Sequence, residues 1–139
     1  MQKRQVKMLS AMLVMVVLAL LAMPAAAMAE DGIAPHFTYI VDSEATMSIS
    51  GTTATVDAWV CGDTIYATKT KIIAELQVKN GNDWIPVAIW TDTQDGLKAH
   101  VNETKSVVKG HTYRVKATGT AWEGSQSETV TFYTEEDVA

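Results

Sequence analysis

The feature that most constrains this chain is a period-two alternation of apolar and polar residues, which recurs along most of its length after residue 36. Successive side chains of a β-strand point to opposite faces, so this period predicts strands with one face in a core. The clearest runs span residues 53–61 and 70–79. The side chains that these two runs direct into a core are Ala54, Val56, Ala58, Val60, Ile72, Ala74, Leu76 and Val78.

Turn residues interrupt the alternation about every eight to twelve positions, which is typical of a β-sandwich or barrel. The Asn80-Gly81 pair predicts a tight hairpin, and Pro86 places its strand at an edge or at a bulge. We expect turns over 92–96 and 122–126. Short turns leave no room for helical crossovers, so the prediction is an all-β chain of seven main strands and one short one, paired antiparallel. The predicted strands are 37–42, 45–50, 53–61, 70–79, 84–91, 97–106, 113–119 and 129–133.

The first 29 residues have the three-part plan of a secretory signal peptide. Three basic residues precede an apolar run from Met8 to Ala22, and Ala27-Met28-Ala29 supplies a cleavage signal of small residues. The apolar run is shorter than the roughly 20 residues that a membrane-spanning helix needs, although a retained anchor is the alternative. We therefore expect cleavage after Ala29, one domain over residues 30–139, and a secreted, extracellular product that does not insert into membranes.

Charge and cysteine content narrow the range of partners. Removing the leader takes three of the eleven basic residues and none of the sixteen acidic ones, which leaves eight against sixteen and a net charge of −8. Such a charge repels phosphate backbones, so we expect no nucleic-acid binding. The single Cys61 cannot close an internal disulfide. It is interpreted either as an outward thiol that pairs between chains or as a buried, inert one.

No recognisable catalytic or metal-binding pattern occurs in the sequence. The three histidines, His36, His100 and His111, lie in separate segments without the spacing of metal ligands. There is no nucleophile elbow or zinc-protease motif, and Cys61 has no neighbouring histidine. We expect neither an enzyme nor a cofactor.

Two alternatives involve aspartates. The first is a hydrolase in which surface carboxylates converge in space. The second is a calcium ion bound at the turn that contains Asp92, Asp95 and Gly96, against the alternative that these side chains cap backbone amides. The carboxylates considered for hydrolysis are Asp57, Asp63, Asp92 and Asp95.

Four tryptophans follow the leader, and two of them are expected to be partly exposed: Trp59 from its parity and Trp122 from its predicted turn. An exposed indole suits stacking on a sugar ring or an apolar protein contact. In the alternative, Trp84 and Trp90 close the ends of the sandwich while the other two cover edges. We predict a non-catalytic binding or interaction module for a protein or glycan, with a carbohydrate-recognition module as the alternative; the edge strand 84–91 and Cys61 also permit weak self-association.

The C-terminal part resembles the last two strands of a fibronectin type III or similar immunoglobulin-like domain. The matching pattern is Val107-x-Lys109-Gly110-x-x-Tyr113-x-Val115-x-Ala117, then Gly124, Ser127 and Val130-x-Phe132-x-Thr134. The resemblance implies an antiparallel sandwich of that type, in which Tyr113 forms a tyrosine corner and bonds back to nearby backbone. Val115 stands where antibody domains have their second cysteine, which implies no intersheet disulfide, and Trp59 has the wrong parity for the family's buried second-strand tryptophan.

The part that follows the leader is also similar in plan to small secreted β-sandwich proteins of low-GC Gram-positive bacteria, a family without known function. This resemblance implies a bacterial, extracellular protein and brings no activity with it. The residues that carry it are Tyr39-Ile40, Ser48-Ile49-Ser50, Thr70-Lys71-Ile72, Leu76-Gln77, Trp84, Trp90 and the segment from Tyr113 to Thr131.

Overall fold

The structure is a computed structural model that describes residues 36–139; the predicted signal peptide, its cleavage site and residues 30–35 lie outside this range. The described residues contain no helix with the length and hydrophobicity of a membrane span. They form an all-β fold, as predicted. The strands are β1 (Ile40–Ser50), β2 (Thr53–Gly62), β3 (Lys69–Asn80), β4 (Asp83–Gln94), β5 (Lys98–Ser106), β6 (Thr112–Glu123), β7 (Gln126–Tyr133) and β8 (Asp137–Val138).

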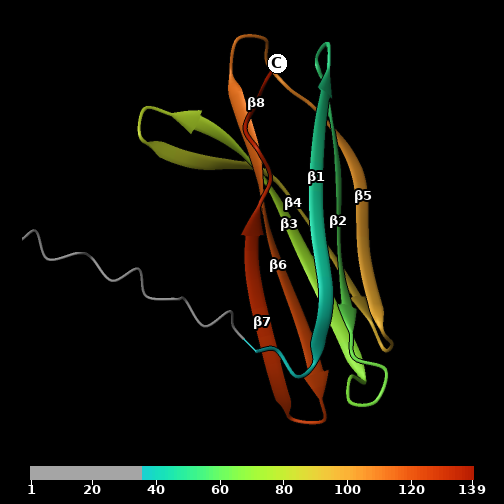
Figure 1. The fold of residues 1–139 in the computed structure, drawn as a ribbon. Helices are drawn as coiled ribbons and strands as arrows, with labels where there is room; N and C mark the ends of the chain where they lie inside the picture. The colour runs from blue at the N-terminus through green and yellow to red at the C-terminus, as the bar shows by residue number, and fades with distance from the viewer. Residues whose placement is uncertain (1–35) are drawn as a thin grey trace, which may run out of the picture. The chain divides into compact units, whose positions relative to one another are not determined.

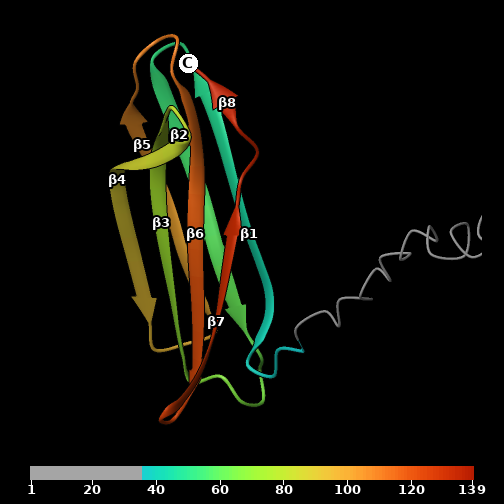
Figure 2. The same ribbon diagram turned by 90° about the vertical axis from the view of Figure 1, so that its left-hand side faces the viewer.

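The strands form two antiparallel sheets. Sheet A has the order β1-β2-β5, and sheet B has the order β4-β3-β6-β7 with the short β8 also paired to β6. Figures 1 and 2 show the two sheets stacked face to face, with the end of the β3–β4 hairpin reaching out beyond the stack. The predicted antiparallel pairing in two layers is confirmed.

The core lies between the inner faces of the two sheets. Val56 of β2, Leu76 of β3 and Val115 of β6 are fully buried, and Phe132 of β7 packs against this cluster while partly exposed. The alternation predicted for these strands is therefore confirmed. The same period places Leu97 on one side of the predicted strand 97–106 with Ala99 and Val101, but β5 begins at Lys98 and the Leu97 side chain is exposed, whereas Ala99 and Val101 are buried.

The two sheets approach each other closely where β6 crosses β2. Gly119 of β6 faces the fully buried Val60 of β2, and a Cβ atom added at Gly119 would lie 2.9 Å from Val60 Cγ2. Only a residue without a side chain leaves room for this valine.

Three hairpins use the same two-residue turn. Their loops are Gly51-Thr52, Gly81-Asn82 and Gly124-Ser125, and in each the glycine alone has positive φ, between 57° and 63°. A glycine at the first central position is what a type II′ turn requires. The hairpin predicted at Asn80-Gly81 is confirmed, with Gly81 rather than Asn80 as the first residue of the loop.

Two expected turns are shorter than predicted. Trp122 and Glu123 belong to β6 and pair with Ser127 and Gln126 of β7, so only two residues remain in that turn. Residues 92–94 likewise continue β4. Both segments have the polar composition that is typical of turns, but their residues are paired with neighbouring strands.

The two predicted opening strands are wrong as separate elements. Residues 37–39 lie outside any strand, and the rest of the two predicted segments forms one strand, β1, whose register shifts between Ile40 and Asp42. This β-bulge adds one residue at Val41 and reverses the parity, so the two halves of the pattern look like separate strands. The short eighth strand lies instead at the C-terminus, where Asp137 and Val138 pair with β6.

Strand β4 is an edge strand of sheet B and is also bulged, as Pro86 predicted. The register shifts where Leu76 pairs with Ala88 and Gln77 with Pro86, which leaves Val87 as the extra residue. Three large apolar side chains remain exposed on this strand: Ile85 by 43%, Val87 by 39% and Ile89 by 58%.

The Tyr113 side chain fixes the segment that precedes β6. Its buried hydroxyl accepts a hydrogen bond of 2.9 Å from the N–H of Val108, five residues upstream.

The Glu128 side chain of β7 fixes the start of β1. Its carboxylate accepts hydrogen bonds from the N–H groups of Thr38, Tyr39 and Ile40 at 2.7 to 3.3 Å. Burial works to raise the pKa of Glu128, but these donors outweigh it and hold that pKa below its usual range.

Candidate functional site

Trp59 lies on the outer face of sheet A, as its parity predicted, and is half-buried. Its cross-strand neighbours are Glu44 of β1 and His100 of β5. The Lys98 ammonium nitrogen lies 4.5 Å from the centroid of the indole ring. A cation therefore covers one ring face, an arrangement worth about 0.5–1 kcal/mol at an exposed site.

A polar cluster lies one step along the same face. The His100 Nε2 atom is 2.9 Å from Asp57 Oδ2, and Asn102 Nδ2 donates to the same oxygen at 2.6 Å. Burial works to raise the pKa of Asp57, but the bonds from His100 and Asn102 and the nearby charges outweigh it and lower that pKa. The face thus presents an aromatic ring beside a fixed carboxylate, an imidazole and an amide (Trp59, Asp57, His100 and Asn102).

Asp92 caps the backbone of a neighbouring strand. Its carboxylate accepts hydrogen bonds from the His100 main-chain N–H at 2.9 Å and from the Gln94 amide at 2.7 Å. The bond from the His100 N–H is the main cause that lowers the pKa of Asp92. Asp95 is exposed in the turn that follows. This geometry favours the capping interpretation of the Asp92–Gly96 segment over calcium coordination.

The four aspartates considered for hydrolysis are brought together only in part. Asp57 and Asp92 both bond to His100, one through its ring and the other through its main chain. Asp63 instead caps the β2–β3 turn by accepting the N–H of Ile65 at 2.7 Å. Among residues 36–139, no group of three or more histidine, cysteine or acidic side chains is arranged to hold a metal ion.

Trp122 lies in β6 rather than in a turn, on the outer face of sheet B. It is half-buried beside its cross-strand partner Lys69, whose ammonium nitrogen lies 5.2 Å from the ring centroid. Beyond the strand pairing, the Trp122 carbonyl oxygen accepts hydrogen bonds from the N–H and the hydroxyl of Thr68. Of the two tryptophans proposed for ligand contact, Trp59 alone stands beside a cluster of fixed polar groups.

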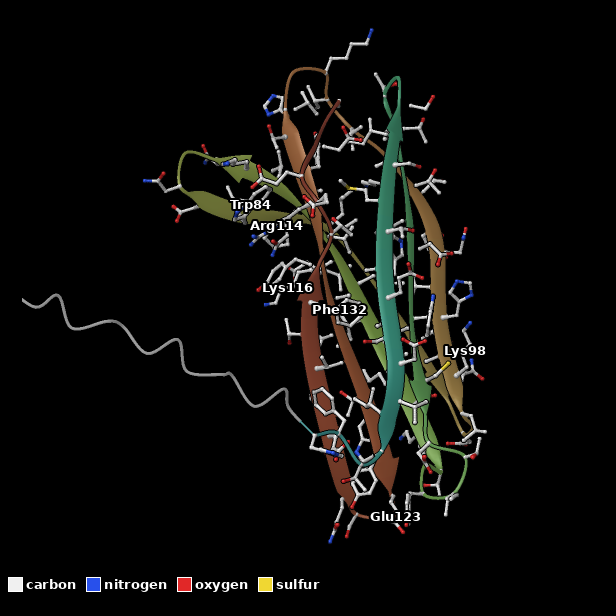
Figure 3. All side chains as sticks on the ribbon, viewed as in Figure 1. Trp84, Lys98, Arg114, Lys116, Glu123 and Phe132 are labelled. Atoms are coloured by element: carbon white, nitrogen blue, oxygen red, sulfur yellow. The ribbon has the colours of Figure 1, made fainter. Side chains whose placement is uncertain are left out.

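A third cation–aromatic cluster crosses sheet B and was not predicted from the sequence. The Arg114 guanidinium lies 4.2 Å from the ring of Trp84 and 4.5 Å from that of Tyr133, and its Nε donates to Gln77 at 2.8 Å. Figure 3 shows Trp84 and Arg114 side by side where the β3–β4 hairpin leaves the sheet, away from Lys98 on the other sheet. Trp84 thus does not close an end of the sandwich, whereas Trp90 packs against the core.

Cys61 is a free thiol near the end of β2 and is half-buried. Its cross-strand neighbours are Asp42 and Lys98, so its side chain lies on the outer face of sheet A. This is the face that its parity predicted.

No protein-family model, curated protein or solved structure matches this chain. Its function has to be inferred from its own geometry.

Proposed function

We propose that this chain is an exported, non-catalytic interaction module with an immunoglobulin-like or fibronectin type III-like domain over residues 30–139. Two observations support the domain type. In sheet order, β1-β2-β5 opposite β3-β6-β7 corresponds to strands A-B-E opposite C-F-G of immunoglobulin-like domains, with β4 added beside β3. Tyr113 makes the backward hydrogen bond of a tyrosine corner. N-terminal sequencing of the exported protein tests the leader, with Glu30 expected as the first residue.

The observation that carries the interaction proposal is the exposed apolar edge of β4. Edge strands present unpaired backbone groups, and soluble proteins usually cover them with charged side chains. Here Ile85, Val87 and Ile89 are all exposed on one edge strand. Several exposed large apolar residues on one edge strand are typical of a protein contact surface.

The occupant that fits this edge is a second copy of the chain. The bulge places Ile85 and Ile89 on opposite faces of the sheet, because Ile85 pairs with the inward-facing Val78 and Ile89 with the outward-facing Glu75. If two β4 strands pair antiparallel about a two-fold axis, Ile89 of both copies lies on one face of the joined sheet and Ile85 of both copies on the other. The contact is then self-complementary, as a two-fold dimer requires. Pro86 lacks an N–H to donate, so the ladder is incomplete and we expect weak association.

Sedimentation velocity over a concentration series tests this dimer. We expect the sedimentation coefficient to rise with concentration and Ile89→Lys to abolish the rise. Ile65→Lys is the matched control, because Ile65 is 79% exposed in the β2–β3 turn, away from the edge. A chain that stays monomeric at millimolar concentration, or a control that dissociates equally, would contradict the proposal.

The second candidate is carbohydrate recognition by the outer face of sheet A. The observation that favours it is Trp59 beside Asp57, His100 and Asn102, because sugar sites combine an aromatic platform with fixed hydrogen-bonding groups. For a sugar ring to stack on Trp59, the Lys98 ammonium group has to move off the face of the indole or contact the sugar from the edge of the indole.

Calorimetric titration with soluble cello-, xylo- and chito-oligosaccharides tests the sugar site. Trp59→Ala should abolish binding, while the matched Trp122→Ala should leave it intact because that ring lacks the polar cluster. Absence of binding by all three series, or equal losses in both variants, would count against carbohydrate recognition by Trp59.

A further inference from the structure

Sheet A has two edge strands, β1 and β5, and in the described part of the chain the second half of β1 has unpaired backbone groups along its outer side. The N-terminal end of β1 is protected, because Glu128 binds the N–H of Ile40 and the Asp42 side chain binds the N–H of Ser43 at 2.8 Å. The Ser43 N–H therefore points away from β2. Since backbone groups of a strand alternate in direction, those of Ala45, Met47 and Ile49 also point outward. None of these three has a hydrogen-bond partner on that side among the described residues.

This half of β1 lacks the protection found on other edges. In β4 the ladder is broken by Pro86 and a bulge, and in β5 the His100 N–H is capped by Asp92. From Ser43 to Ser50, β1 contains no proline, lysine or bulge. Such an edge is a template for an added strand, in which main-chain hydrogen bonds supply affinity and side-chain sites supply specificity.

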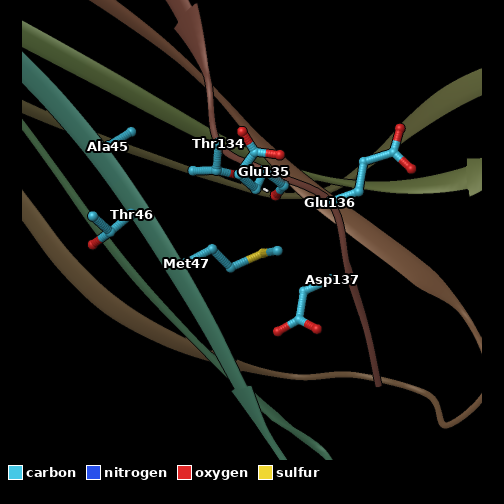
Figure 4. Close-up of a pocket in the computed structure, with 7 residues that line it drawn as sticks. All are labelled: Ala45, Thr46, Met47, Thr134, Glu135, Glu136 and Asp137. Atoms are coloured by element: carbon cyan, nitrogen blue, oxygen red, sulfur yellow. Dashed lines mark hydrogen bonds between the residues drawn. The ribbon is translucent and has the colours of Figure 1, made fainter.

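A cavity of about 280 Å³ lies beside the open part of this edge. One wall is β1 at residues 45–47, and the other is the segment 134–137 that follows β7. Figure 4 shows the Met47 side chain extending between these two walls. Residues of an added strand opposite Ala45 and Met47 would project to the same side as those two side chains, toward the cavity.

The far wall of the cavity is acidic. It carries Glu135, Glu136 and Asp137, and within residues 36–139 its one ion pair is an exposed contact of 3.4 Å between Glu136 and Lys79. We propose that the β1 edge binds an extended basic segment of a partner protein by strand addition, with alternate lysine or arginine side chains entering the cavity. This surface is separate from the β4 edge, so it adds a second, charge-selective contact to the proposed interaction module.

The first test uses a blocked heptapeptide of alternating lysine and threonine. Amide shifts of the isotope-labelled protein are followed by NMR during titration. We expect them to change at Ala45, Met47 and Ile49 and over residues 134–137. The control peptides carry glutamate in place of lysine, or methyl groups on alternate backbone nitrogens, and neither should bind.

Variants of the protein separate charge from backbone pairing. Glu135→Gln with Glu136→Gln should weaken binding of the lysine peptide about three- to tenfold, the effect of two exposed ion pairs. Asp95→Asn with Glu103→Gln removes two exposed carboxylates elsewhere and should change the affinity less than twofold. Ala45→Pro removes an outward N–H and should abolish binding; should it not fold, the methylated peptide on the natural chain tests the same bond.

Several results would overturn the proposal. They are equal binding of the lysine and glutamate peptides, undiminished binding of the methylated peptide, and shifts confined to another surface. A dimer of the natural chain that Ala45→Pro dissociates, without peptide binding, would show that a second copy occupies β1 instead. Because Ile89 lies on β4, Ile89→Lys should leave peptide binding unchanged. The β4 dimer and the β1 peptide site can therefore be refuted independently of each other.

Discussion

Replacing Gly119 with alanine tests the closest approach between the two sheets. The new Cβ atom would lie 2.9 Å from Val60 Cγ2, 3.0 Å from Val60 Cβ and 3.5 Å from Val130 Cγ1. Carbon atoms in favourable contact are about 3.5–4.0 Å apart, so Val60 or the sheet has to move by roughly half an ångström or more. Val60 is fully buried and β-branched, which leaves its side chain little freedom to rotate away.

The expected loss combines two opposing effects. Overpacking a core by one carbon atom costs about 1–3 kcal/mol, whereas alanine is favoured over glycine inside a strand by about 0.5–1 kcal/mol. We therefore expect Gly119→Ala to lower the free energy of unfolding by about 1–2 kcal/mol, with a fall in Tm of about 4–8 °C for each kcal/mol.

Urea denaturation followed by tryptophan fluorescence measures this change. Gly96→Ala is the matched control, because an added Cβ there meets no atom within 4 Å. Val60→Ala alone should cost about 2 kcal/mol, but in the double variant the two changes should compensate by about 1 kcal/mol or more. A Gly119→Ala protein as stable as the natural chain, or a strictly additive double variant, would refute the packing argument.

Three further substitutions test individual contacts by the same denaturation assay. Tyr113→Phe keeps a ring that is 3% exposed but leaves the Val108 N–H without its acceptor, so we expect a loss of about 1–2 kcal/mol, and an unchanged midpoint would contradict this. Glu128→Gln should cost about 1 kcal/mol at neutral pH. Because the folded pKa of Glu128 is lowered, the advantage of the natural chain should be complete above the unfolded pKa of about 4.3 and disappear as the pH falls through the folded value; a difference independent of pH would refute it. Arg114→Lys keeps the charge but loses planar stacking on two rings, so we expect a loss of about 1 kcal/mol, whereas Lys105→Arg on the exposed part of β5 should change nothing.

The core faces of β2, β3 and β6 could be predicted from the sequence because they are buried along nearly their whole length. In such strands every second residue is apolar, so parity alone places Val56, Leu76 and Val115 in the core. The prediction failed where the residue types indicate neither a bulge nor the true end of a strand. The bulge at Val41 divided β1 into two apparent strands, and the paired end of β6 at Trp122 resembled a turn.

The sequence could predict the sheet face of single residues in the candidate site, but not which residues contact one another. Parity placed Trp59 on an outer face, but it cannot tell which strands are neighbours. Lys98, which covers the ring, lies on β5, and the bond between Asp57 and His100 joins residues 43 positions apart. The contacts of Glu128 with the start of β1 span about 90 residues. Such pairs follow from the order of strands in the sheets, which a single sequence does not specify.

The three glycine-led hairpins bear on how the chain folds. Each joins strands that are adjacent in sequence, so the β1–β2, β3–β4 and β6–β7 hairpins can each form within microseconds, with the turn setting the register. The slower events bring β5 to β2 and β6 to β3, pairings between segments far apart along the chain. Substituting Gly51, Gly81 or Gly124 should therefore slow refolding most where its hairpin forms before the rate-limiting step.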